Sequence, residues 1–428
     1  MLSLLQLING NRYKLEFYMI LAIFTFHNII WHAELEDALL NLNSMIQVRP
    51  LPEEERQMIG HKDLTKCAPT VDSKQLHMFS VSSDGNRIEH WSHPILNDSA
   101  VANFFIIVDL VGNECLNDPS LLAGAKPCFY DIQSNNRPSI SRISICFNNH
   151  IWRGFQAGFD LFRHEVLHAL GIGMLHPQTE IKKAPKPELI SWKTGPSTQQ
   201  LIRNSYLDFS EKAVNFARSY FNCQKIDAIL ADNEETFHLN EYLFGNELMT
   251  PILSNGQNYF THFTGLILES THFGNLSWYN VNKELVEQES QEYWYGRDAG
   301  CNFVEQSCYE FIKNRSNLFE GAAFPFCTES ELKKTMNDRD LNICFSNKTH
   351  TFKLKATCQI EYDIEEFDQE AEYELKPVPL NNQFKSLFRR RKVYGSNKDF
   401  RFCPLISHLF DGPFDEIPLN GLPTKCPN

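Results

Sequence analysis

The stretch Asp160-Leu-Phe-Arg-His164-Glu165-Val-Leu-His168-Ala-Leu-Gly171 decides the fold of this chain, because it sets an HExxH motif within an apolar helical pattern. Large apolar residues recur around it at steps of three and four, and no proline intervenes, so we predict one helix over residues 152–170. Residues four apart share one face of a helix. His164 and His168 can therefore point at one metal ion, with Glu165 beside its water. Gly171 stands where a helix that must turn back favours glycine.

Zinc suits this arrangement, because it binds imidazole nitrogen and with three protein ligands keeps a fourth position open for water. Such a water is acidic enough near neutral pH to attack a carbonyl, and Glu165 would accept its proton as the general base. The alternative is a chance HExxH on an ordinary solvated helix face. The apolar surroundings argue against it, since two histidines and a glutamate are costly to bury without a partner. We predict one Zn²⁺ per chain.

Length and composition indicate a large protein of an oxidising compartment. The 428 residues are expected to form two or three domains. A net charge of −13 argues against nucleic acid as a partner, and we interpret the one basic run, Arg389–Lys392, as an exposed loop. Twelve cysteines without a CxxC pair favour disulfides over a zinc knuckle. Four sequons support a secreted glycoprotein: Asn97, Asn275, Asn314 and Asn347.

The N-terminal region contains an apolar run, Phe17–Phe26, that follows the basic residues Arg12 and Lys14. This pattern predicts a signal peptide with cleavage near Ala33. The run is too short and interrupted for a clear membrane span. An uncleaved signal anchor is the alternative, and we expect membrane association only in that case. The C-terminal residues show no hydrophobic tail of the kind that a lipid-anchor signal requires.

The pattern of strands and helices is α+β rather than a regular βαβ repeat. Residues 102–110 and 142–147 have the composition of strands, with turn chemistry at 135–138 between them. Further helices are expected near 208–220 and 256–271, before a region rich in cysteines.

A third zinc ligand is required, and the compact spacing HExxHxxGxxH would place it at position 174, which is Met174. The candidates farther along are His238, His262, His272, Glu234 and Glu241. Position favours His238, because Met249 follows eleven residues later in Asn246–Pro251. A methionine turn beneath the metal is a feature of metzincins. We expect His262 and His272 to be ordinary helix-face residues.

Taken together, these motifs resemble the leishmanolysin family of metzincin zinc metallopeptidases, including its invadolysin-like animal members. That family combines HExxHxxG, a long insertion, a distant third histidine and a methionine turn, which here reads Asn246-Glu-Leu-Met249. The likeness runs from about residue 100 to 410. Other matching segments are Ala102–Leu110, Cys115–Cys128, Arg137–Cys146, Phe221–Cys223, Gly274–Asn282, Trp294–Cys301, Phe326–Cys327 and Phe402–Pro404.

The resemblance implies a metzincin-type α+β fold, with a mixed sheet and an active-site helix, and a zinc endopeptidase acting on protein or peptide substrates. It implies His164, His168 and His238 as zinc ligands, Glu165 as general base and Met249 as the structural turn residue. The implied disulfides are Cys223–Cys301, Cys308–Cys403 and Cys327–Cys358.

The expected organisation has six parts. They are 1–33, a signal peptide or anchor; 34–100, an N-terminal arm or short pro-segment; 101–175, the N-terminal catalytic subdomain with the zinc helix; 176–237, an insertion; 238–300, the third histidine, methionine turn and C-terminal catalytic subdomain; and 301–428, a Cys-rich domain stapled by disulfides. Cys67 in the arm is interpreted as a disulfide partner, or as a thiolate that blocks the open zinc position.

Three alternatives remain open. In a gluzincin-type protease, Glu234 or Glu235 would replace His238 as the ligand. In an inactive secreted adhesion or binding protein, the fold would persist without catalysis. In a purely structural zinc site, a protein ligand such as Cys67 would fill the fourth position. The approach to the third histidine, 231–237, also departs from the family because it contains no glycine.

Overall fold

The computed structural model describes a large part of the chain in two compact units. One unit comprises Met1–Ala184 and Phe260–Ser290, and the other comprises Pro185–Tyr259 and Gln291–Asn428. The six parts expected from the sequence stay predictions. The described residues are 17–22, 29–48, 67, 76–81, 88–91, 104–109, 121–131, 137–146, 152, 156–173, 188–193, 199–232, 237–254, 256–273, 276–346, 351–359, 403–407 and 423–427.

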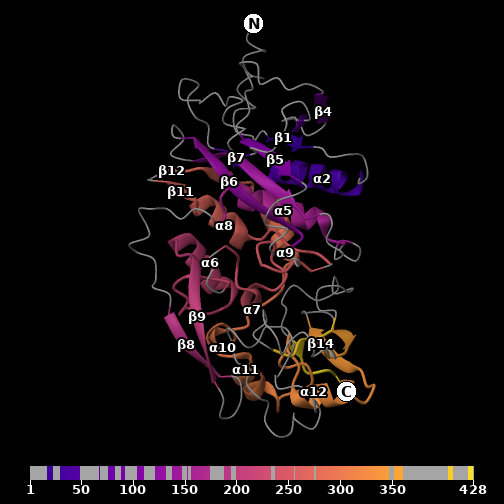
Figure 1. Ribbon diagram of the computed structural model, residues 1–428. Helices are drawn as coiled ribbons and strands as arrows, with labels where there is room; N and C mark the ends of the chain where they lie inside the picture. Colours follow the sequence, from indigo (N-terminus) through magenta and orange to yellow (C-terminus); the bar gives the residue numbers. More distant parts are fainter. Residues whose placement is uncertain are drawn as a thin grey trace. The chain divides into compact units, whose positions relative to one another are not determined.

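A mixed sheet forms the framework of the first unit (Figure 1). Its six strands lie in the order β4-β3-β1-β5-β7-β6. The neighbours β1 and β5, and β5 and β7, are parallel, whereas the other pairs are antiparallel. The predicted α+β class with a mixed sheet is therefore confirmed. The strands are β1 (Phe17–Ala22), β3 (Leu76–Val81), β4 (Ile88–Trp91), β5 (Phe104–Asp109), β6 (Ala123–Asp131) and β7 (Arg137–Ile145).

Two helices cover one face of this sheet, α2 (Ile29–Met45) and α5 (Gly158–Ala169). They pack against each other, and α2 contacts β3 while α5 contacts β6 and β7 (Figure 1). The buried face of α2 carries apolar residues at helical spacing, and each has an exposed fraction of 0%. They are Leu35, Ala38, Leu39 and Leu42. Helix α2 is thus part of the core beneath the HExxH helix.

Helix α5 begins at Gly158, so the start predicted at residue 152 was wrong. The indole Nε1 of Trp152 donates a hydrogen bond to the carbonyl of Cys146 at 3.1 Å, so Trp152 is held next to the end of β7 instead of joining the helix. Its ring still stacks on Phe162 with centroids 6.4 Å apart. The helix ends as expected, because Gly171 takes a φ of 116° that favours glycine.

The strands expected at 102–110 and 142–147 are present as β5 and β7, but β7 starts earlier, at Arg137. The turn expected at 135–138 is therefore wrong for Arg137 and Pro138, while residues 135 and 136 lie outside the described residues. Pro138 is tolerated because this end of β7 pairs with β6 alone, and pairing with β5 begins at Ile140.

The apolar run interpreted as a signal peptide overlaps a described strand. Residues Phe17–Ala22 form β1, which pairs antiparallel with β3 and parallel with β5. Ala33, the expected cleavage neighbourhood, falls within α2. The signal peptide therefore stays a prediction. Its cleavage would remove β1 from the sheet. Among the described residues, no helix is long and apolar enough to cross a bilayer.

The rest of the first unit comes from Phe260–Ser290, and one strand of this segment pairs with a strand from the N-terminal part of the unit. Strand β2 (Ile46–Val48), which follows α2, pairs antiparallel with β13 (Tyr279–Val281). The helix predicted over 256–271 begins only at His262, because Thr261 caps it by accepting a hydrogen bond from the Phe263 N–H. The other elements are α8 (His262–Ser270), β11 (His272–Phe273), β12 (Leu276–Ser277) and α9 (Lys283–Glu292).

The second unit is built from short elements. The helix predicted near 208–220 is α6 (Glu211–Tyr220), capped by Ser210. The strands form two small sheets, in the orders β10-β9-β8 and β15-β14-β16. The elements are β8 (Glu188–Lys193), β9 (Gln199–Asp208), β10 (Ile229–Ala231), α7 (Glu241–Phe244), α10 (Cys301–Glu305), α11 (Cys308–Arg315), α12 (Glu329–Thr335), β14 (Leu341–Ser346), β15 (Thr351–Ala356) and β16 (Pro423–Thr424).

Disulfides staple this unit. All three bonds implied by the family resemblance are confirmed: Cys223–Cys301, Cys308–Cys403 and Cys327–Cys358. A bond that the sequence analysis did not identify joins Cys344 to Cys426. In the first unit Cys67 is bonded to Cys128, so its interpretation as a disulfide partner is confirmed. Its sulfur is not a free thiolate, and the zinc-blocking interpretation is wrong for this state of the chain.

The burial of α2 yields a test of the core beneath α5. We expect Leu39→Ala to lower the free energy of unfolding by about 2–5 kcal/mol, because it removes a fully buried side chain and leaves a cavity. Urea denaturation measures this change. Leu189→Ala in β8 is the matched control, because Leu189 is 69% exposed. Equal midpoints for the two variants would contradict the placement of α2.

Candidate metal centre

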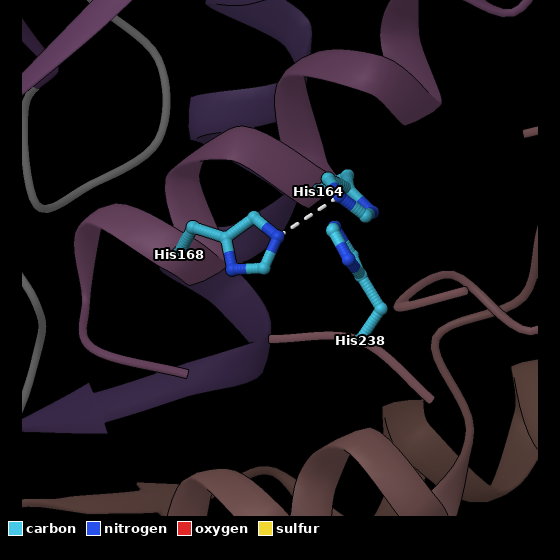
Figure 2. Close-up of side chains that lie close together, drawn as sticks. All are labelled: His164, His168 and His238. Carbon is cyan, nitrogen blue, oxygen red and sulfur yellow. Dashed lines mark hydrogen bonds between the residues drawn. The ribbon is translucent and has the colours of Figure 1, made fainter. Parts of the chain in front are cut away.

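Helix α5 buries the three polar residues of the HExxH motif. His164, Glu165 and His168 each have an exposed fraction of 4%. The Nε2 atoms of the two histidines lie 3.0 Å apart, and the rings meet edge to face with centroids separated by 4.6 Å (Figure 2). The four-residue spacing therefore aims both imidazoles at one point, as the helical geometry requires.

The chain beyond the helix orients the His168 ring. At Gly171 the backbone turns, and the N–H of Ile172 donates to the carbonyl of Leu167 at 3.1 Å. The carbonyl of Ile172 then lies 2.9 Å from Nδ1 of His168 and can accept its hydrogen. That tautomer leaves the lone pair of Nε2 free to bind a metal. Burial lowers the pKa of His168 to about 4, so the imidazole is neutral near pH 7, as a ligand must be.

His238 joins the two helix histidines. One ligand atom from each of His164, His168 and His238 lies within 4.8 Å of the others, and this is the group with metal-binding geometry among the described residues. Figure 2 shows the three rings converging. The donor set fits zinc, because three imidazole nitrogens and a buried, neutral His168 match a site that keeps one position open.

Backbone hydrogen bonds tie His238 to the methionine turn. The carbonyl of His238 accepts from the N–H of Asp232 at 2.8 Å. The next residue, Leu239, donates its N–H to the carbonyl of Met249 at 2.8 Å. Met249 itself is completely buried. The segment that carries the third histidine and the turn that contains Met249 are therefore held as one piece.

Glu247 holds the methionine turn in place, and the sequence analysis assigned this residue no role. Its side chain has an exposed fraction of 0%, and its Oε2 accepts the N–H of Met249 at 2.6 Å. Thr250 donates its hydroxyl to the carbonyl of Glu247 at 2.9 Å, and the N–H of Leu248 donates to the carbonyl of Tyr259 at 2.8 Å. The signal that could have identified it is a charged residue directly before Leu248 and Met249 in the turn.

Two tyrosines anchor the short helix that follows His238. Asn240 caps α7 by accepting from the N–H of Leu243 at 3.2 Å. The hydroxyl of Tyr295 donates to the carbonyl of Tyr242 at 2.9 Å, and that of Tyr293 donates to the carbonyl of Phe244 at 2.6 Å. Burial raises the pKa of both tyrosines well above the ordinary value, so both keep the hydrogens that they donate.

The other ligand candidates lie elsewhere. Glu241 accepts the N–H of Ile252 at 3.3 Å. The Nε2 of His262 lies 2.7 Å from a carboxylate oxygen of Glu287, which fits the expectation of a helix-face residue. The backbone of His272 is in β11, but its side chain is outside the description. Residues outside the described part of the chain include the alternative ligands Glu234 and Glu235 and the sequons at Asn97, Asn275 and Asn347.

Comparisons with known proteins identify relatives of this chain. A family model described as leishmanolysin matches residues 99–414, a range that includes all three histidines and the methionine turn. Two relatives, both named leishmanolysin-like peptidase, come from Caenorhabditis elegans, at 24% identity over 267 residues, and Caenorhabditis briggsae, at 23% over 268. Each alignment covers 53% of this chain but only 38% of the relative. The chain thus matches well under half of each relative's length.

The contact of Glu247 with the turn predicts a difference between two substitutions. We expect Glu247→Leu to lower the free energy of unfolding by about 1–3 kcal/mol, because it leaves the buried N–H of Met249 without its acceptor. Glu247→Gln keeps an acceptor oxygen and is expected to lose less. Thermal unfolding of the two variants beside the unchanged protein measures this. A Gln variant as unstable as the Leu variant would contradict the role of the hydrogen bond.

Proposed function

Because the chain belongs to the leishmanolysin family of metallopeptidases, we propose that it is a zinc-dependent endopeptidase that hydrolyses peptide bonds of protein substrates. The observation that carries this proposal is the grouping of His164, His168 and His238 within 4.8 Å, next to the buried Glu165. The same residues were expected as ligands and base from the HExxH motif and the family resemblance. The metal would be one Zn²⁺ per chain.

The three histidines would hold the ion through their ring nitrogens. When bound, zinc supplies the polarisation of the scissile carbonyl and the acidity of the attacking water. Glu165 follows His164 directly, and its carboxylate would take the proton of that water. Its burial places the carboxylate in a medium of low dielectric constant, where its interaction with a proton donor is stronger than in water. Glu165 would then pass the proton to the leaving amine.

The fixed surroundings of the ligands would keep the site ready for turnover. The hydrogen bond from His168 to the carbonyl of Ile172 holds one ring, and the bond between Leu239 and Met249 holds the segment of the third ligand. Met249 would line the floor of the site with an apolar thioether, which cannot compete as a charged group. Such pre-orientation lowers the cost of reaching the transition state.

We propose that the protein is secreted and acts outside the cell. The five disulfides in the described residues support it, because disulfides persist in oxidising compartments. Asn314, in a sequon near the end of α11, is exposed and so accessible to glycosylation. Membrane association would require that the N-terminal segment act as an uncleaved anchor.

The general-base role is tested by Glu165→Gln. We expect this variant to retain one zinc per chain and to lose about 10²–10⁴-fold in the rate of peptide cleavage, because the imidazoles remain while the proton acceptor is gone. Elemental analysis gives the zinc content, and digestion of a denatured protein with and without a chelator gives the activity. Equal cleavage by both forms would exclude Glu165 as the base. Zinc in both forms with cleavage by neither would favour the inactive binding protein.

The third ligand is tested by His238→Ala. We expect the purified variant to contain well below one zinc per chain and to be inactive, because two imidazoles alone hold the ion weakly. Glu234→Gln and Glu235→Gln serve as controls and should keep both zinc and activity. Zinc retained by His238→Ala but lost from either glutamine variant would establish the gluzincin alternative instead.

A further inference from the structure

Arg163, which precedes the first zinc ligand, is a charged side chain buried within the first unit. Its exposed fraction is 3%. One terminal nitrogen, Nη2, donates to Oδ1 of Asp160 at 2.7 Å. The other, Nη1, contacts both carboxylate oxygens of Glu289, at 2.9 and 3.0 Å, and Oδ1 of Asn41 at 3.4 Å. The guanidinium also lies 4.8 Å above the ring of Phe159.

These contacts join three helices that are distant in sequence. Asn41 belongs to α2, Arg163 to α5 and Glu289 to α9. The carboxylate of Glu289 reaches further, since Oε1 accepts the N–H of Phe260 at 2.6 Å. Phe260 directly precedes Thr261, the N-cap of α8. The guanidinium is therefore a polar contact that links α5 to both α2 and α9 within the unit.

Net stability does not account for a buried pair of this kind. An ion pair in an apolar interior gains little over well-packed apolar side chains, because both charges must be desolvated. Its distinctive property is direction: the planar guanidinium presents its donors in a rigid fork, which binds two carboxylates only at one orientation. Because Arg163 and His164 are neighbours on one rigid helix, an orientation imposed on the first is imposed on the second.

We propose that Arg163 is a positioning residue for the metal centre. Its contacts with Asn41 of α2 and Glu289 of α9 set the rotation of α5 that presents His164 and His168 together, while Asp160, on α5 itself, holds the guanidinium in place. This inference rests on the proposed zinc peptidase function and deepens it. Arg163 touches neither metal nor substrate in this account. It acts through the helix that carries both ligands.

The test separates positioning from stability with a double variant. Arg163→Met leaves Asp160 and Glu289 as uncompensated buried charges and should destabilise the fold. Arg163→Met combined with Glu289→Gln removes one of those charges, keeps an acceptor for the N–H of Phe260 and should recover part of the unfolding midpoint. We expect both variants of the full chain to bind zinc about 10–100-fold more weakly, as found when the supporting contacts of metal ligands are removed. Competition with a chromogenic chelator measures this affinity.

Activity supplies a second readout. At saturating zinc we expect the double variant to cleave a peptide with kcat lowered roughly 10–100-fold and KM unchanged, because a displaced ligand pair misplaces the reacting groups without touching the substrate. Glu289→Gln, which keeps an acceptor for the N–H of Phe260 but lacks the charge, carries the same measurements if Arg163→Met fails to fold. Lys225→Met is the matched control: it removes an exposed pair with Glu305 and should change neither value.

The outcomes are distinguishable from those of the proposed function. Absence of zinc from the unchanged protein would overturn the proposed function itself. Zinc and cleavage in the unchanged protein, with the same zinc affinity and kcat in the double variant and in Glu289→Gln, would overturn the positioning role alone. Weakened zinc binding in a double variant that is more stable than Arg163→Met alone would support it.

Discussion

The constraint on which the rest depends is the burial of two imidazoles and a carboxylate on one apolar helix. Polar groups at 4% exposure are tolerable only when each has a partner. The spacing of helix α5 sets the Nε2 atoms of His164 and His168 3.0 Å apart. After the turn at Gly171, the carbonyl of Ile172 accepts a hydrogen bond from Nδ1 of His168. A bound cation would complete the set by engaging both nitrogens at once.

The packing of α2, the methionine turn and the disulfides support the helix and the segment that carry the three histidines. The packing of α2 against α5 removes apolar surface from water, which contributes most of the stability of such a layer. The methionine turn holds the third histidine through backbone hydrogen bonds, which do not depend on flexible side chains. Disulfides Cys223–Cys301 and Cys327–Cys358 constrain the chain around short elements that bury little by themselves.

The errors of the sequence analysis share one cause, which is tertiary contact. Trp152 has the apolar spacing of the helix, but a hydrogen bond to Cys146 holds it outside. Pro138 signals a turn in isolation, yet it fits into β7 because that end of the strand has only one neighbour. The run beginning at Phe17 is a different case, because it has the composition of a signal peptide and also that of a strand. The structure pairs it with β3 and β5, and the signal peptide stays a prediction.

The sequence by itself determined what depends on local spacing: the HExxH helix, its glycine end, the mixed α and β class and, through family resemblance, three disulfides and the proposed ligands. Only the tertiary structure decided the contacts of Arg163 with Glu289, which stand 126 residues apart, and of Glu247 with the methionine turn. The physical reason is that helical periodicity depends on residues close together in the sequence, whereas the partner of a buried charge depends on how distant segments pack.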